Sequence, residues 1–325
     1  MNAPSARRGG TGGTGGKKGT GGRSGTADFE VVAAVTQRLA VLLEVGIAPA
    51  SAWRHVAADG RSSVAAAVVA QGGVGLEVAE QLLQARGLAP TAERAAWSAL
   101  AAAWWVAVES GAPLAPTLHR FAASLRELAQ SLRDVEVALA GPLATSRIVL
   151  ALPAVGLLFG ALLGFDAPRI LATTPAGWGC LVVGGALIVG GVRWNRRLVR
   201  SASENDPTPG LAFELLAVAV SGGASLERAR SLVDSVLAEA ELPHLDAAVD
   251  AVLAFSRSAG IPAAGLLHAE AQELRRRTRT RAQLRAAELG TRLLLPLGVC
   301  ILPSFVALGV APIVIAILSS TVGQL

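Results

Sequence analysis

The chain has 325 residues, 52% of them hydrophobic, and a mean hydropathy of +0.50, which is too apolar for two ordinary soluble domains and predicts a membrane protein with substantial polar parts. Its net charge of +5 comes almost entirely from arginine, since Lys17 and Lys18 are the only lysines. The arginines gather beside apolar segments instead of alternating with aromatic residues, which argues against a nucleic-acid partner and favours membrane lipid.

Residues 1–26 contain Gly, Thr, Ser and basic residues without an apolar period. They predict a disordered basic tail and not a signal peptide, so we expect the N-terminus in the cytoplasm. From Phe29 to Gly46 apolar residues recur at helical spacing, and a turn at 46–49 starts another helix. Further helices are expected over 63–70, 75–85 and 91–110. With the long helix that follows, these make residues 27–147 a cytosolic helical domain.

That long helix follows a glycine–proline turn at Gly111 and Pro113. Its apolar residues alternate steps of four and three, at Leu114, Leu118, Phe121, Leu125, Leu128, Leu132, Val135 and Leu139. Such a seam predicts a helix that is buried along one face. Residues 148–164 carry no charge, and about 17 residues at ~1.5 Å each approach the ~30 Å of a bilayer core. We therefore expect the helix to continue directly into a first transmembrane span.

A short external loop is expected at 165–175, and a second uncharged span at 176–192 would complete a transmembrane hairpin. Arginines crowd the end of this span, at Arg193, Arg196, Arg197 and Arg200. Because positive residues remain on the cytoplasmic side, the large polar parts should face the cytoplasm.

A cytosolic linker is expected at 193–210, followed by a second, shorter helical domain at 211–292. Residues 293–318 lack charge and contain three prolines, at Pro296, Pro303 and Pro312. This pattern predicts one kinked span or two short re-entrant helices. The tail, 319–325, has no Lys or Arg and is expected outside. The fold class is therefore an all-α membrane protein with two cytosolic helical bundles and three transmembrane helices.

The second domain looks like a repeat of the first. Without a gap, Gly111, Pro113, Leu118, His119, Ala122, Leu125, Arg126 and Gly141 align with Gly260, Pro262, Leu267, His268, Ala271, Leu274, Arg275 and Gly290. A weaker match aligns Leu42, Leu43, Gly46, Ala48 and Ala52 with Ala219, Val220, Gly223, Ser225 and Ala229. The pattern predicts an internal duplication.

In the second copy the apolar seam is lost, because Leu128 and Leu132 are replaced by Arg277 and Arg281. Two interpretations remain: a helix that faces solvent or lipid headgroups, and a surface that docks a partner. The candidate partner contacts are the turns at Gly111, Pro113, Gly260 and Pro262, and the arginines Arg275, Arg276, Arg277, Arg279, Arg281 and Arg285.

Catalytic and metal-binding patterns were not found. His55, His119, His244 and His268 form no metal-binding pair, and the glycine-rich tail lacks the strand and helix of a nucleotide-binding loop. His119 and His268 occupy equivalent places, for which packing is the simpler role. The expected spans contain no ionisable residue, which argues against transport. We expect no enzymatic activity, no cofactor and no metal.

Three short motifs carry a resemblance: Glu109–Leu114, Arg257–Pro262, and the ending LLPLGVCILPSF at 294–305. With the order of helical domain, two-span hairpin, helical domain and final span, the chain resembles the type II secretion system F-domain family over residues 29 to 318. It looks especially like the TadB and TadC platform proteins of tight-adherence (Flp-type) pili. The interruption at 72–75 departs from the family pattern, and the choice between the two roles stays open.

The resemblance implies a non-enzymatic platform in the bacterial inner membrane. It would gather beside a cytosolic secretion ATPase and pass motion to pilin subunits, with itself or a paralogous platform protein as a further partner. The alternative is a membrane scaffold or permease-like subunit of an unrelated transport complex. Gene neighbours would separate the two.

Overall fold

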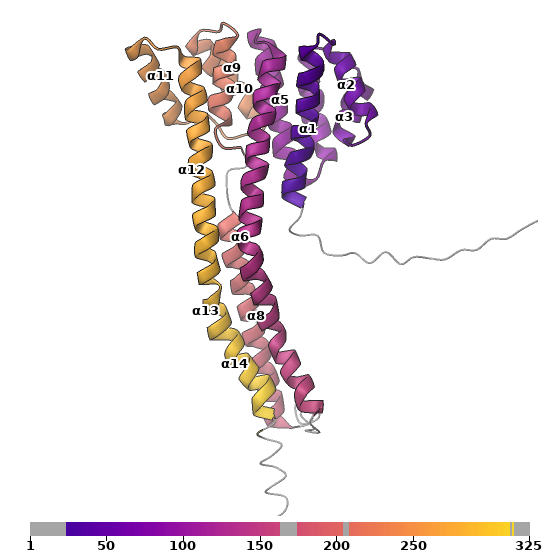
Figure 1. Ribbon diagram of the computed structural model, residues 1–325, viewed down its shortest axis with the longest axis vertical. Helices are drawn as coiled ribbons and strands as arrows, with labels where there is room; N and C mark the ends of the chain where they lie inside the picture. The colour runs from indigo at the N-terminus through magenta and orange to yellow at the C-terminus, as the bar shows by residue number, and fades with distance from the viewer. Residues whose placement is uncertain (1–23, 163–173, 204–207, 313, 315–325) are drawn as a thin grey trace, which may run out of the picture.

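The computed structural model describes residues 24–162, 174–203, 208–312 and 314. Over these ranges all regular secondary structure is helical, as the sequence predicts, and strands are absent from them. Figure 1 shows a wide helical head that narrows into a long stalk.

The first half of the head follows the expected order of short helices. These are α1 (Ser24–Glu44), α2 (Pro49–Ala58), α3 (Ser63–Gln71), α4 (Glu77–Ala85), the 3₁₀ turn η1 (Arg86–Leu88) and α5 (Thr91–Ser110). Local chemistry sets several boundaries. The Ser62 hydroxyl accepts a hydrogen bond from the amide of Ala65 at the start of α3, and Gly72 ends that helix in the left-handed region at φ +69°. The helices expected in this half are confirmed.

Helix α6 (Leu114–Leu162) is a single element of 49 residues that belongs to both the head and the stalk. It passes Pro142 and Pro153 without a break. In the head, its seam is buried at Leu118, Phe121 and Leu125, and α1 packs along it. The prediction that this helix continues directly into the apolar segment is confirmed.

The second half of the head contains fewer helices. After α8 (Pro175–Ser203) come α9 (Leu211–Ser221), α10 (Leu226–Glu239), α11 (Ala247–Ala259) and α12 (Ala263–Arg292). Side chains of Ser225 and Asp246 cap α10 and α11 by accepting hydrogen bonds from the first-turn amides. Helix α8 continues to Ser203, so the expected linker at 193–210 begins as helix, and Thr208 to Gly210 are buried.

The C-terminal segment continues the path of α12 through α13 (Leu294–Pro296), the π-helical turn η2 (Leu297–Ile301), α14 (Leu302–Phe305) and a second π-helical turn, η3 (Val306–Val310). Pro303 has no amide proton and its ring crowds the carbonyl four residues earlier, and a wide turn relieves both problems. This continuous path favours the kinked span over two re-entrant helices.

The C-terminal segment packs against both α6 and α8 in the stalk. Glycines allow this close approach: a Cβ added at Gly184 would lie 2.4 Å from the Leu308 side chain, and one at Gly156 would lie 2.8 Å from the ring of Phe305. The Ser304 hydroxyl donates a 3.1 Å hydrogen bond to the Gly184 carbonyl. This bond satisfies a buried polar group that lipid could not.

Two of the described helical stretches are long and apolar enough to cross a membrane by length and composition. They are Gly177–Leu198 and Ala263–Val310. The expected first span, 148–164, extends beyond the described residues at 163 and 164 and is not one of these two. It stays a prediction. The end of the expected third span, after residue 314, and the tail at 319–325 lie outside the described residues and also stay predictions.

One apolar core runs through both halves of the head, from Phe29 in α1 to Ala271 in α12. Trp53 and Trp104 are at its centre with ring centroids 5.9 Å apart. Arg86 adds a polar tie between the halves, because it donates to the Ala240 carbonyl at 2.9 Å and pairs with Glu241 at 2.9 Å. The two predicted cytosolic domains are therefore packed together.

Candidate functional site

The two glycine–proline turns have the same backbone geometry. Gly111 ends α5 at φ +74° and Gly260 ends α11 at φ +65°, both in the left-handed region where glycine is favoured. Each long helix then begins three residues later, at Leu114 and Ala263. Both turns lie at the end of the head that is farthest from the stalk (Figure 1).

The weaker repeat also has matching geometry. The amide of Ile47 donates to Leu42 and that of Gly46 to Leu43, and the amides of Ala224 and Gly223 donate to Ala219 and Val220 in the same way. This is the paired hydrogen bonding of a Schellman motif. The local structure therefore agrees with the sequence alignment at the two aligned glycines that follow helix ends, Gly46 with Gly223 and Gly111 with Gly260. Superposition of the whole halves stays a prediction.

The predicted arginines do not form one cluster with the turns. Arg275 follows the start of α12 by 12 residues, or about 18 Å along the helix axis. Gly111 instead approaches the α9–α10 connection: a Cβ added to it would lie 3.9 Å from the Gly222 carbonyl. The candidate residues therefore form separate surfaces on the head.

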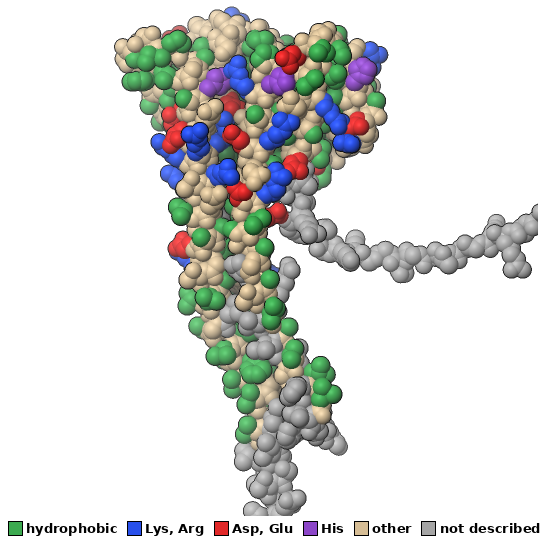
Figure 2. All heavy atoms as spheres, viewed as in Figure 1, with side chains coloured by type: hydrophobic (Ala, Val, Ile, Leu, Met, Phe, Trp, Pro, Cys, Tyr) green, Lys and Arg blue, Asp and Glu red, His purple; other side chains and the backbone are tan. Residues whose placement is uncertain are grey.

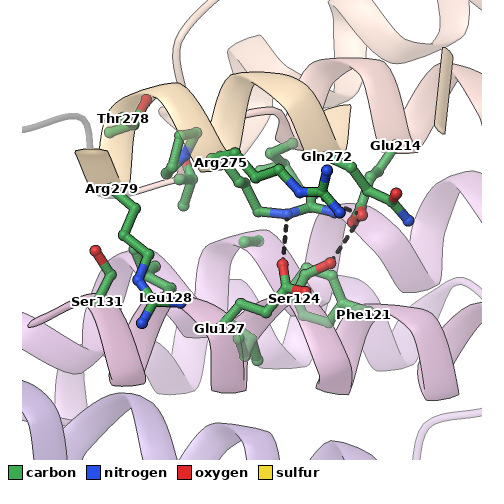
Figure 3. A pocket seen from close by; sticks show the side chains of 16 residues that line it. Phe121, Ser124, Glu127, Leu128, Ser131, Glu214, Gln272, Arg275, Thr278 and Arg279 are labelled. Carbon is green, nitrogen blue, oxygen red and sulfur yellow. Dashed lines mark hydrogen bonds and ion pairs between the residues drawn. The ribbon is translucent and has the colours of Figure 1, made fainter. Parts of the chain in front are cut away.

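Arg275 is an interior residue and not a surface contact. Its side chain is only 11% exposed and pairs with Glu214 at 2.8 Å and Glu127 at 3.1 Å, while Ser124 donates to Glu214 at 2.7 Å. Figure 3 shows these groups converging from α6, α9 and α12. Since Glu214 is 12% exposed, each charge depends on the other to remain in this position.

A cavity of about 340 Å³ adjoins this cluster. Its floor is apolar, with Phe121, Leu125 and Leu211, and its polar residues include Thr278 and Arg276 (Figure 3). The cations and carboxylates around it are largely paired with one another.

Arg279 forms the next contact down α12. Its guanidinium binds Asp134 of α6, with Nε at 3.0 Å from the carboxylate, and Gln283 donates to the same oxygen at 3.2 Å. Hydrogen bonding from Gln130, and then from Arg279, holds the pKa of Asp134 below its usual range. Arg275 and Arg279 thus join α12 to α6.

The remaining predicted arginines are exposed. Arg277 pairs with Glu273 one turn earlier at 2.7 Å, a contact worth little in water. Arg276 and Arg281 have no ion-pair partner within the described ranges, and Arg285 lies farther toward the stalk. Figure 2 shows basic side chains gathered on the lower part of the head. The prediction that the second copy cannot be buried along its length is confirmed at Arg277 and Arg281.

The two equivalent histidines make different contacts. His119 lies between Gln37 and Glu44 of α1, with its ring nitrogens 3.0 and 2.9 Å from their side chains. His268 instead accepts a hydrogen bond from Arg120 of α6 at 2.6 Å. Burial, and then the charges of Arg120 and Arg275, lower the pKa of His268. These effects favour the neutral form of His268, which forms another link between α12 and α6.

Sequence reasoning missed the acidic partners of the buried arginine. Glu214 is the one charged residue in the apolar stretch LAFELLAVAV of α9, and a lone carboxylate in such a stretch predicts a buried cation nearby. That signal would have pointed to an interior arginine. Sequence spacing alone does not distinguish Arg275 from Arg276, because the assignment depends on which face of α12 is covered.

Comparisons with known proteins returned nothing: no protein-family profile, curated protein or solved structure matches this chain.

Proposed function

We propose that this protein is an inner-membrane platform of a type II secretion or tight-adherence pilus machine, coupling a cytosolic secretion ATPase to the extrusion of pilin subunits. The observation that carries the proposal is the unbroken run of α6 from the packed head into the apolar segment. Helix α12 follows the same course beside it. A displacement of the head would therefore be transmitted along these two helices into the bilayer plane.

The proposed topology has three crossings, a cytoplasmic N-terminus and an external C-terminus. Arg193, Arg196 and Arg197 support this orientation, because they are exposed where α8 leaves its apolar part and returns to the head. The head is proposed to be a duplication in which α1 and α2 correspond to α9 and α10, and α5 and α6 to α11 and α12. Helices α3 and α4 have no counterpart in the second half.

The exposed arginines of α12 are proposed to bind a protein partner. At ~1.5 Å per residue, Arg281 is about 18 Å and Arg276 about 26 Å above Leu293, where the apolar segment begins. The interfacial layer of one leaflet is only about 5–8 Å deep. Headgroups therefore reach Arg292 but not Arg276, Arg277 or Arg281. An acidic surface on the ATPase is the proposed occupant, with the turns at Gly111 and Gly260 as a second contact region.

Charge reversal tests this proposal. Changing Arg276, Arg277 and Arg281 to Glu should abolish piliation and co-purification with the ATPase, while the protein still inserts in the membrane. A matched control changes the exposed Arg54, Arg61 and Arg228, which lie elsewhere on the head, to Glu. Normal piliation in the α12 variant, or equal loss in the control, would contradict the proposed site.

A further inference from the structure

One edge of the head exposes an apolar helix face. On α11, Phe255 is 56% exposed, and Ile261 just after the helix is 43% exposed. Along the same face the exposed residues include the small, uncharged Ala247, Ala251, Ala254 and Ala259, while the exposed Arg257 lies about 160° from Phe255 around the helix. We name the six apolar residues the α11 face. Hydrophobic side chains are visible in Figure 2 at the end of the head where Figure 1 places α11.

The corresponding face in the first half is buried. In the register that pairs Gly111 with Gly260, the counterparts of Phe255 and Ile261 are Val106 and Ala112 on and after α5, which are 0% and 7% exposed. Helices α9 and α10 of the second half pack against α5, as do α1 and α4 of the first half. Within the described part of the chain, no further helices pack on α11 as α9 and α10 pack on α5, so the equivalent face of the second half is exposed.

The first half of the head, in turn, exposes apolar residues on and just after α1. On α1, Val41 is 45% exposed and Ala34 is exposed on the same side, and Val45 just after the helix is 71% exposed. We name these three residues the α1 face. A groove of about 280 Å³ between α1 and α2 borders it.

The counterparts of the α1 face lie in the contact between the halves. In the register that pairs Gly46 with Gly223, Ala34, Val41 and Val45 correspond to Leu211, Val218 and Gly222. Leu211 is 6% and Val218 8% exposed. A Cβ added at Gly222 would lie 2.4 Å from the Ser110 carbonyl oxygen of α5. The two open faces of the chain are therefore the two sides of an interface that is already formed inside it.

We propose that a second copy of this chain docks its α1 face on the α11 face, repeating between molecules the contact that joins the two halves within one. The proposal rests on the proposed duplication and not on the secretion role. In Figure 1 α11 lies at one edge of the head and α1 lies toward the other, with α2 and α3 beside it, and α6 and α12 descend side by side from the head. Successive copies would therefore keep their stalks parallel in one membrane. A contact between two different faces closes into a ring or continues as a row.

Polar groups support the same register. Within the chain, Arg275 binds Glu214, and at the corresponding positions Arg126 binds Gln37 at 3.0 Å. Ser124, which contacts Glu214, corresponds to Glu273. In the docked pair, Glu273 of one copy would therefore lie beside Arg126 of the next copy. The Glu273 carboxylate would pair with Arg126 there, as the Glu214 carboxylate pairs with Arg275 within the chain.

Three substitutions make the contact between copies looser than the internal one. The charged Arg38 stands at the position of Leu215, which is only 1% exposed in the internal interface. Arg276 stands at the position of Glu127, so it faces Arg126 with like charge. Val45 stands at the position of Gly222. In the internal interface Ser110 lies so close to Gly222 that a larger side chain there would clash with it. We therefore expect an association that dilution reverses, unlike the contact inside the head.

Thiol cross-linking in membranes tests the proposal. Ala259 and Val45 are the counterparts of Ser110 and Gly222, which touch in the internal interface. In a background with Cys180 and Cys300 changed to Ala, differently tagged Val45→Cys and Ala259→Cys chains are co-expressed and treated with a short bis-maleimide. We expect a dimer that carries both tags, and a ladder of larger products when one chain carries both substitutions.

Two controls separate docking from chance collision. Val74→Cys, which is 65% exposed and outside both faces, should give at least fivefold less product with Ala259→Cys. Adding Phe255→Arg to the Ala259→Cys chain should reduce the mixed product about as much, since an exposed position tolerates the change in the monomer.

Three outcomes would overturn the proposal. They are no mixed product although a fluorescent maleimide labels both thiols, equal product with Val74→Cys, and dimers of Val45→Cys or Ala259→Cys alone, which indicate a symmetric contact. The test needs no ATPase or pilin, so loss of the platform role in other experiments would leave its result unchanged.

Discussion

The two halves of the head share their turns but differ in how their long helices are covered. In the first half, α1 has 21 residues and packs along the leucine seam of α6. In the second, α9 has only 11 residues, so it covers α12 near its start alone. Beyond Leu274 the equivalent seam positions are Arg277 and Arg281, both exposed. The loss of the seam therefore follows from the shorter covering helix.

The contacts between α12 and α6 differ in kind from those between α6 and α1. Below Gln283, which donates a hydrogen bond to Asp134, they are apolar, with Ala286 and Leu289 packed against Leu139. Above it, the buried cluster around Arg275 and the link from Arg120 to His268 join the helices. Substitutions at corresponding positions in the two halves should therefore have unequal effects, and three such pairs sharpen the comparison.

The largest difference is expected between Arg275 and its counterpart Arg126. Arg275→Ala should lower the free energy of unfolding by about 3 kcal/mol, because Glu214 would keep its buried position without a cation. Arg126→Ala should cost less than about 1 kcal/mol, since Arg126 is exposed and donates its hydrogen bond to the neutral Gln37. Unfolding in detergent can be followed by the fluorescence of the buried Trp53, Trp97 and Trp104.

Arg276→Ala, next to Arg275 but exposed, is the matched control and should leave stability within about 0.5 kcal/mol. Equal losses at positions 275 and 126 would show that the buried cluster does not distinguish the halves.

An intermediate difference is expected between Gly222 and its counterpart Val45. Gly222→Ala should cost about 2 kcal/mol, because the new Cβ would meet a backbone oxygen of Ser110 at 2.4 Å. Its φ of −75° suits alanine, so the loss reports the contact and not backbone strain. Val45→Ala, at a position 71% exposed, should change the unfolding free energy little. A neutral Gly222→Ala variant in the same fluorescence assay would mean that the halves are packed less closely.

The smallest difference concerns His268 and its counterpart His119. The pKa of His268 is lowered in the folded head, so the unfolded chain binds more protons between that pKa and the ordinary value near 6.5. The stability of the head should therefore fall as the pH drops from about 6.5 toward the lowered pKa, where protonation also removes the acceptor for Arg120.

His268→Gln should reduce this dependence on pH, measured as the change in midpoint of thermal unfolding between pH 7.5 and pH 5. The same change at the exposed His244 is the control. An unaltered pH profile in His268→Gln would exclude the buried imidazole as its cause.

Much of the helical order could be predicted because it depends on local chemistry. The seam from Leu114 to Leu139 predicts the buried face of α6, and the glycines at 46, 111, 223 and 260 predict four helix ends that the structure confirms. The direct continuation of α6 past Arg147 follows from the absence of a polar linker between the seam and the apolar segment, although Pro153 lies within the helix.

The arrangement between the helices could not be predicted in the same way. Arg275 and Arg276 are adjacent in sequence, yet one is enclosed by α6 and α9 while the other is exposed. Successive residues point about 100° apart on a helix, so their burial depends on where the neighbouring helices lie. The core shared by the two halves and the tie of Arg86 to Ala240 are similarly contacts over long sequence separations, which periodicity does not encode.

The two routes from head to stalk differ in stiffness. Helix α6 stays α-helical over 49 residues, about 74 Å, although Pro142 and Pro153 each lack the amide proton of one backbone hydrogen bond. The C-terminal route is interrupted twice by π-helical turns, at 297–301 and 306–310, where the bonding is wider and the rod is more compliant. A force on the head along the stalk would then be carried mainly by α6, while the C-terminal segment deforms. The two would therefore slide past one another inside the stalk.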